Sequence, residues 1–173
     1  MLLIRKATME DTEALGRIHS RTWQAAYAGI IPDEYLIQLT PESRAAFFKQ
    51  KLLEPAVPNK LSESYIALDQ DTPVGLLALH TAPDPDVIPG TGGIAALYVL
   101  PEHQGRGFGR SLMDYGVKRL KETGHTGVIL WVLEQNTRAI RFYERYGYVY
   151  DGTSKEIVLG KPLVEMRYFL PGD

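Results

Sequence analysis

The decisive stretch of this chain is residues 97–111, LYVLPEHQGRGFGRS. A short run of β-branched and aromatic residues stops at Pro101, which cannot continue a ladder of strand hydrogen bonds. Three glycines then alternate with other residues: Gly105, Gly107 and Gly109. Such glycines let a ligand approach the backbone amides closely, and the helical pattern that follows begins with unpaired N–H groups. With the charges of Arg106 and Arg110 beside it, this stretch predicts a binding site for a phosphate-bearing ligand.

The glycine pattern does not fit the two common nucleotide loops. The dinucleotide fingerprint G-x-G-x-x-G would need a glycine at Arg110. The mononucleotide loop G-x-x-x-x-G-K-[ST] would need a glycine at Gln104 and a lysine that is absent. The pattern Q/R-x-x-G-x-G/A does fit, and in it the stretch resembles the acetyl-CoA pyrophosphate loop of the GCN5-related N-acetyltransferase (GNAT) superfamily. Taken alone, the pattern equally fits a glycine-rich turn that caps a helix.

A second block follows after one predicted helix, which ends at Gly124, and one predicted strand at residues 128–133. Asn136 is a favourable N-cap for another helix, and Gly147 is placed to end it. Residues 136–148, NTRAIRFYERYGY, resemble the second conserved block of the same superfamily, N-x-x-A-x-x-F-Y-x-x-x-G-F/Y. Since both blocks occur in the expected order, the chain is identified as a member of that superfamily.

The resemblance implies a single domain over residues 1–173 with a mixed α/β fold. Its central sheet is expected to be twisted, mostly antiparallel, flanked by helices and splayed open at the cofactor site. Hydrophobic periodicity and breaker residues place the other strands at 2–8, 64–69, 74–81, 94–100, 148–159 and 162–170, and helices at 11–21, from Pro32, and at 41–53. The proline- and glycine-rich residues 81–93 are predicted to form a long flexible connection.

Composition limits the class of protein. The apolar fraction of 45% and the charged fraction of 23% are typical of a globular domain. A net charge of −2 gives no basic footprint for nucleic acid, and the apolar runs are too short for a membrane span. The absence of cysteine excludes disulfides and thiolate chemistry, and the four histidines show no metal-ligand spacing. We therefore expect a cytoplasmic protein with no metal and no nucleic-acid or membrane partner, and a homodimer is left open.

The resemblance also implies site residues. Acetyl-CoA is expected to bind as co-substrate through Tyr98, Val99, Leu100, Gln104, Gly105, Arg106, Gly107, Phe108, Gly109, Arg110, Asn136 and Tyr143. The backbone N–H of Val99 or Leu100, at a bulge ending the fourth strand, would polarise the thioester carbonyl. Tyr143 aligns with the family's general acid, although it also has the spacing of a packing residue. Trp23 and Tyr27 resemble the aromatic wall of the acceptor pocket, and core packing explains them equally well.

The acid and base of such a reaction have definite requirements. A phenol of pKa ~10 that protonates a thiolate of pKa ~8.5 works uphill by about 2 kcal/mol, which a positioned hydrogen bond offsets. An alkyl amine of pKa ~10.4 is neutral about once in 2,500 molecules at pH 7, a penalty of about 4.6 kcal/mol. Many family members carry a glutamate on the fourth strand, whereas this chain has Gly93 there with Ala95 and Ala96 beside it, so no base is assigned. Asp84 and Asp86 either attract a cationic substrate or are solvated turn residues.

Two functions from different classes follow. The first is an N-acetyltransferase that moves the acetyl group of acetyl-CoA to a primary amine of a small molecule or peptide by direct attack, with Tyr143 as the acid. The second is a catalytically silent acyl-CoA-binding or regulatory module of the same fold, for which the missing strand glutamate is the argument. The identity of the amine, the base, the oligomeric state and the use of other acyl groups are left open.

Overall fold

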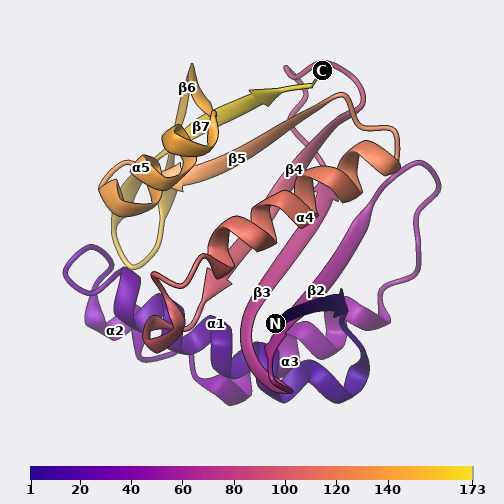
Figure 1. Cartoon of the computed structure of the whole chain (residues 1–173). Coiled ribbons are helices and arrows are strands. Elements are labelled where there is room, and N and C mark those ends of the chain that lie inside the picture. The colour runs from indigo at the N-terminus through magenta and orange to yellow at the C-terminus, as the bar shows by residue number, and fades with distance from the viewer. Residues whose placement is uncertain (173) are drawn as a thin grey trace.

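The computed structural model of the chain describes residues 1–172 (Figure 1). Within them, seven strands form one sheet: β1 (Leu2–Lys6), β2 (Ser62–Asp69), β3 (Thr72–Thr81), β4 (Thr91–Val99), β5 (Gly127–Leu133), β6 (Val149–Val158) and β7 (Pro162–Pro171). The α-helices are α1 (Thr12–Ala26), α2 (Asp33–Leu36), α3 (Pro41–Leu53), α4 (Phe108–Glu122) and α5 (Thr137–Tyr146). Two short 3₁₀ turns precede α1 and α4: η1 (Met9–Asp11) and η2 (Pro101–His103).

The sheet has the strand order β1-β2-β3-β4-β5-β7-β6, and only β4 and β5 are parallel neighbours. These two strands pair over three residues, from Thr91 opposite Gly127 to Gly93 opposite Ile129. Beyond Gly93 they diverge, and Figure 1 shows the sheet opening between them. The predicted mixed α/β fold, with a mostly antiparallel sheet splayed open at its centre, is confirmed.

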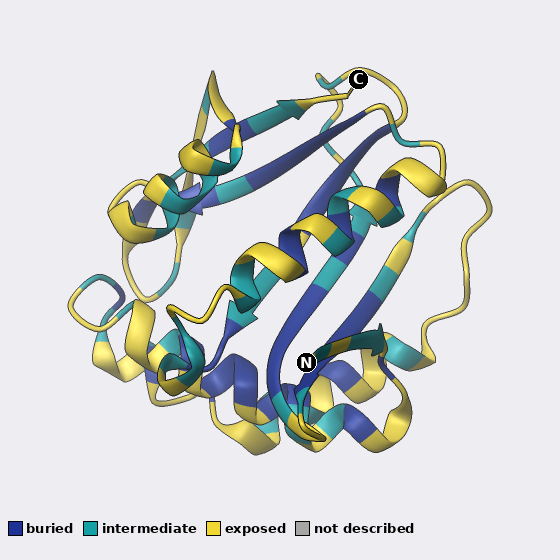
Figure 2. Cartoon of the chain, viewed as in Figure 1, coloured by how far each residue is buried: buried dark blue, intermediate teal, exposed yellow. Residues whose placement is uncertain are grey.

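Helices cover both faces of the sheet. On one face, α4 and α5 enclose the largest core cluster, which includes Leu77, Met113 and Tyr148. On the other face, α1 and α3 pack against a second cluster that includes Ile18 and Leu76. Figure 2 shows the central strands as the buried layer between exposed helix surfaces. Because side chains alternate between the faces of a strand, each face of β4 presents a different set of residues to its helices.

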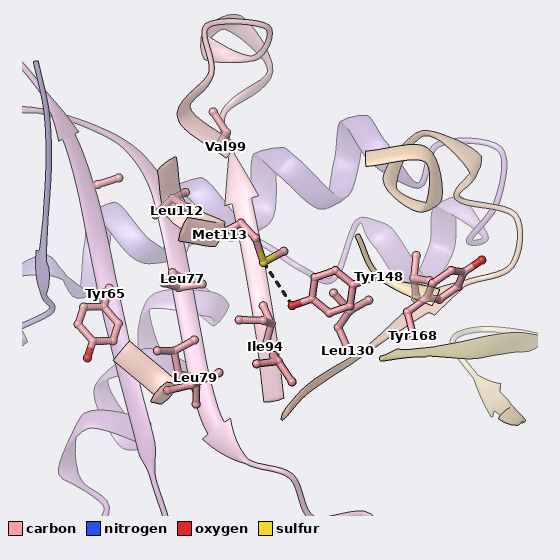
Figure 3. Close-up of a cluster of buried hydrophobic side chains, with 14 of the residues drawn as sticks. Tyr65, Leu77, Leu79, Ile94, Val99, Leu112, Met113, Leu130, Tyr148 and Tyr168 are labelled. Carbon is pink, nitrogen blue, oxygen red and sulfur yellow. Dashed lines mark hydrogen bonds between the residues drawn. The ribbon is translucent and has the colours of Figure 1, made fainter. Parts of the chain in front are cut away.

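The largest core cluster packs the start of α4 against the sheet, and Figure 3 shows its buried side chains. Leu112 and Met113 of α4 are fully buried against Leu77 of β3. Tyr148 lies in the same cluster, and its hydroxyl donates to the Met113 sulfur at 3.4 Å. Apolar side chains therefore anchor the first turns of α4 in the core, and the backbone N–H groups at the N-terminus of the helix are not part of that packing.

Several boundaries differ from the sequence-based prediction. Helix α1 runs to Ala26 rather than ending near Arg21, and the Tyr27 N–H closes its last turn on the Trp23 carbonyl at 3.0 Å. Pro32 caps α2 from outside instead of occupying its first position. The strand predicted from residue 94 begins at Thr91, since its first three residues pair with β5. The long connection therefore shrinks to residues 82–90.

The acidic turn in that connection is part of an ion network. Arg167 of β7 is 4% exposed and contacts Asp86 at 2.7 Å, Asp151 at 2.6 Å and Asp84 at 3.4 Å. Asp84 also accepts a hydrogen bond from the Trp131 indole at 3.0 Å. The prediction of solvated turn residues is wrong for Asp84, whose side chain is enclosed, whereas Asp86 is exposed and also binds the buried guanidinium. The network holds the β3–β4 connection against β5, β6 and β7.

Candidate active site

A cavity of about 600 Å³ lies where β4 and β5 diverge, and α1, α5 and the start of α4 complete its wall. The structure brings together around it most of the residues that the sequence singled out: Tyr27, Tyr98, Val99, Gln104, Gly105, Gly107, Gly109, Arg110, Asn136 and Tyr143. Four others do not line it: Trp23, Leu100, Arg106 and Phe108. Two segments that are about 40 residues apart in sequence thus form one site.

The glycine loop presents unpaired amides to this cavity. Gly105 and Gly107 have φ values of 77° and 82°, and a Cβ at either position would meet nothing within 4 Å. Gly107 is the N-cap of α4, and the first hydrogen bond of that helix runs from the Ser111 N–H to the Gly107 carbonyl at 3.1 Å. The N–H groups of residues 108–110 precede that bond and have no partner within the helix. A helix end of this kind favours an anion.

The two arginines of the loop have different surroundings. Arg106 pairs with Asp69 at 2.8 Å and lies over the Phe108 ring at 4.6 Å, so both side chains face away from the cavity. Arg110 lines the cavity, is 64% exposed, and lies 3.8 Å from Asp114. Arg106 and Phe108 therefore remain predicted cofactor residues only through their backbone.

Two further arginines line the cavity from α5, and the sequence analysis missed both: Arg138 and Arg145. Their spacing of seven residues places them on one face of a helix, and this spacing could have predicted from the sequence that they act together. Together with Arg110 they give the cavity three arginines in its lining. Three guanidinium groups in a cavity that also has unpaired helix amides suit a ligand with several phosphate groups.

Backbone hydrogen bonding along β4 alternates between its two sides. The Leu100 N–H donates to the Val74 carbonyl at 2.9 Å, so it is used within the β3–β4 pair. Since bonded and non-bonded partners alternate in an antiparallel pair, Leu97 and Val99 direct their backbone groups away from β3, into the gap. The Gln104 side chain donates to the Val99 carbonyl at 2.9 Å, which agrees with this direction.

The expected backbone donor to a thioester carbonyl is corrected by this alternation. Leu100 is excluded because its N–H already has a partner, and Val99 remains. The bulge does not end the strand: Ala96 pairs with Ala78 and Ile94 with Leu79, which leaves Ala95 as the extra residue. Leu97 also directs its N–H into the gap, which counting back by two residues from Val99 along the strand would have predicted.

Three tyrosines line the cavity: Tyr27, Tyr98 and Tyr143. Burial raises the pKa of Tyr143, whose hydroxyl makes no hydrogen bond to any residue in 1–172. Burial also raises the pKa of Tyr27, and the nearby amide of Asn136 opposes that shift. Burial likewise raises the pKa of Tyr98. All three phenols therefore keep their protons at neutral pH and can donate them in hydrogen bonds.

The aromatic wall differs in part from the prediction. Tyr27 lines the cavity, whereas Trp23 lies behind it, 4.8 Å from Tyr27 and stacked 5.1 Å from His19. Trp23 is therefore a packing residue that supports Tyr27. The second aromatic residue of the wall is Trp131 of β5, with the Lys155 ammonium 3.9 Å from its ring centroid. Trp131 was missed because its strand reads as a continuous apolar run.

In residues 1–172, no group of three or more histidine, cysteine, aspartate and glutamate side chains is arranged to hold a metal ion. Among the same residues, no helix has the length and apolar character needed to cross a membrane.

Comparison with known proteins agrees with this geometry. The model of the acetyltransferase (GNAT) family matches residues 21–148. A spermidine N(1)-acetyltransferase of Thermoplasma acidophilum is 28% identical over 153 residues, covering 87% of this chain and 89% of that protein. A peptidyl-lysine N-acetyltransferase of Salmonella typhimurium is 28% identical over 172 residues, which is 99% of each chain. The solved structure of the PaiA N-acetyltransferase from Thermoplasma acidophilum in complex with coenzyme A has a TM-score of 0.75 at 24% identity, covering 96% of this chain and 98% of that one. Because the matched residues make up well over half of the chain, this protein belongs to the GNAT family of acetyltransferases.

Proposed function

We propose that the protein moves the acetyl group of acetyl-CoA to a primary alkyl amine by direct attack of the amine nitrogen on the thioester carbonyl. The observation that carries this proposal is the composition of the cavity between β4 and β5. It joins the unpaired amides of α4 and three arginines to Tyr143 and Tyr27. A polyphosphate ligand bound at the former would reach the phenols with an extended chain lying along β4.

The residues around the cavity fit the parts of acetyl-CoA. The N–H groups of residues 108–110 would bind the pyrophosphate, with Arg110, Arg138 and Arg145 as neighbouring charges. The backbone groups of Val99, which point into the gap, would bind the extended arm as a neighbouring strand would. The Val99 carbonyl already accepts a hydrogen bond from the Gln104 side chain at 2.9 Å, so the Val99 N–H is the group left for the arm.

The chemical step needs polarisation of the carbonyl and a proton for the leaving sulfur. The N–H of Leu97 faces the gap and would donate to the carbonyl oxygen as negative charge develops there. As the C–N bond forms and the C–S bond breaks, the thiolate takes the proton of the Tyr143 hydroxyl. That hydroxyl has no partner within residues 1–172, so no existing hydrogen bond is lost when it turns toward sulfur.

The acceptor end of the site favours a cationic amine. Burial raises the pKa of Glu165 on β7, and its charge in turn helps raise the pKa of Tyr27 and Tyr98. Its only cationic partner among residues 1–172 is Lys155, at 3.8 Å. A carboxylate with one long ion pair can bind an incoming ammonium group. The names of two relatives, for spermidine and for peptidyl-lysine, both describe alkyl amines.

Release of free thiol from acetyl-CoA tests the proposal. The panel contains spermidine, a lysine-containing peptide, a free amino acid and aniline, and we expect the cationic alkyl amines to give the highest kcat/KM. Glu165→Gln should raise the KM of these amines and leave the KM of acetyl-CoA unchanged, whereas Glu156→Gln on the exposed strand β6 should change neither. Tight CoA binding by calorimetry without thiol release for any amine would instead indicate the catalytically silent module.

A further inference from the structure

We propose that His80 of β3 is the general base of the acetyl transfer. Its ring occupies the space that a side chain at Gly93 of β4 would fill. This inference rests on the proposed function and adds the residue that the sequence left unassigned. His80 and Gly93 are direct partners in the β3–β4 pair, so their side-chain positions lie on the same face of the sheet. That face is the one on which Leu76 packs with α1.

The imidazole of His80 lies on the backbone of β4. A Cβ built at Gly93 would be 2.3 Å from His80 Nε2 and 2.5 Å from its Cδ2. Real Cβ atoms do not approach so closely, so no residue other than glycine fits at position 93 without moving the ring. The position of the His80 ring therefore depends on glycine at residue 93, because the ring occupies the space that the Cβ of any other residue would need.

That place adjoins the cavity. Gly93 is the last residue of β4 that pairs with β5, so the ring lies where the two strands begin to diverge. The next two residues, Ile94 and Ala95, line the cavity, and Ala95 is the exposed residue of the bulge. His80 and Gly93 do not themselves line the cavity, so a proton would pass from the cavity wall at Ala95 to the ring through water. Neither of its ring nitrogens makes a hydrogen bond to a residue in 1–172.

The surroundings keep the ring neutral. Burial lowers the pKa of His80, and the charge of Lys51 on α3 acts in the same direction, whereas Asp84 in the β3–β4 connection opposes both. Asp84 is held by Arg167 and by the Trp131 indole, so its charge is fixed in place and partly neutralised. A neutral imidazole with an unbonded ring nitrogen can accept a proton at physiological pH.

The proposed step moves one proton from the amine to His80 and one from Tyr143 to sulfur. The neutral amine attacks the carbonyl carbon, the C–N bond forms, and the nitrogen acquires a positive charge that makes its proton acidic. That proton passes through water to the neutral ring of His80, the C–S bond breaks, and its electron pair goes to sulfur. The thiolate takes the proton of Tyr143, and the proton on His80 returns to Tyr143 through solvent, so amine and thioester give amide and thiol.

The test compares His80→Gln with wild type over a range of pH. General bases contribute about 10²–10⁴-fold, so kcat should fall by about 100-fold or more, with the KM of acetyl-CoA little changed. The ratio of wild-type to variant rate cancels the titration of the amine itself. We expect this ratio to be high at neutral pH and to fall as pH drops through a value below 6.5, because only neutral His80 accepts a proton. His125→Gln, on the opposite face beside Thr81, is the matched control and should retain wild-type activity.

Gly93→Ala provides a second test that keeps the histidine. Its Cβ must displace the ring, so kcat should fall at least tenfold while acetyl-CoA binding by calorimetry is retained. A loss in His80→Gln that is the same at every pH would show a structural role and overturn the proposal, as would rates within threefold of wild type in both variants. Absence of thiol release by the wild-type protein with every amine would overturn the proposed function itself, and His80 as its base with it.

Discussion

Replacing Tyr143 with phenylalanine tests the acid of the proposed reaction. The change keeps the ring, which packs on Phe142 and Tyr148 at centroid distances of 5.5 Å and 6.0 Å. It removes a hydroxyl that has no hydrogen-bond partner within residues 1–172. Losing an unpartnered hydroxyl costs no internal hydrogen bond, so the melting temperature should stay the same.

The expected loss of rate follows from the two pKa values involved. General acids contribute about 10²–10⁴-fold, and a thiolate is already a fair leaving group, so we expect kcat to fall about 30- to 300-fold. Burial raises the pKa of Tyr143, and it also disfavours a thiolate formed in the same cavity. The two shifts have the same direction, so they offset one another in the pKa difference that sets the cost of the proton transfer.

The assay is thiol release at saturating amine, with the KM of acetyl-CoA expected to change by less than about fivefold, since the phenol makes at most one hydrogen bond to sulfur. Because the raised pKa keeps Tyr143 protonated, the wild-type profile should show no alkaline limb near the ordinary pKa of 10.0. Tyr148→Phe is the matched control: it removes the bond to the Met113 sulfur and should lower stability without lowering kcat. If Tyr143→Phe turns over within threefold of wild type, water protonates the thiolate and Tyr143 only packs.

Three further predictions concern the loop and the core. Gly107→Val should raise the Kd for CoA about ten- to a hundredfold, because a side chain at φ 82° strains the loop and removes one or two hydrogen bonds of ~1.5–3 kcal/mol each; calorimetry on the folded variant measures this, and an unchanged Kd would place the phosphates elsewhere. Arg110→Ala should weaken CoA binding more than Arg106→Ala, because Arg110 lines the cavity while Arg106 is paired with Asp69; the excess should shrink at higher ionic strength, and equal losses would contradict the assignment. Glu63→Gln should lower the free energy of unfolding at neutral pH, since Arg119 lowers the pKa of Glu63 from 4.5 to about 2. This difference in free energy from wild type, measured by urea unfolding, should be lost as the pH falls from 4.5 through 2, and a difference that is the same at every pH would refute the ion pair as its cause.

Local sequence signals predicted those parts of the fold that depend on neighbouring residues. Helix α3 was predicted at its observed bounds, because Pro41 fits the first turn and Thr40 caps the Ser43 N–H. The glycine loop and the start of α4 were predicted for the same reason: the conformations of Gly105 and Gly107 are properties of a few adjacent residues. The resemblance to a known family then joined these segments into one site.

Contacts between distant segments were beyond such signals. The turn carboxylates Asp84 and Asp86 read as solvated because their partner, Arg167, lies 81 or more residues away. The choice between Val99 and Leu100 as the backbone donor stayed open in the sequence, because which N–H groups face the gap depends on the register with β3. One extra residue at Ala95 shifts that register, and a bulge leaves no mark in a run of small apolar side chains.

Gly93 shows most clearly how a sequence comparison and a structure can differ. Compared position by position, glycine in place of glutamate is a loss of function, and it was the only argument for a catalytically silent protein. In the folded chain, the same glycine is the condition for His80 to lie over β4, since any Cβ there would collide with the ring. Two strands that pair side by side can exchange which of them supplies a functional group, provided that the other gives up its side chain. A sequence motif that covers one strand cannot detect such an exchange between two strands. The pH dependence of the His80 variant is the measurement that decides whether it has occurred here.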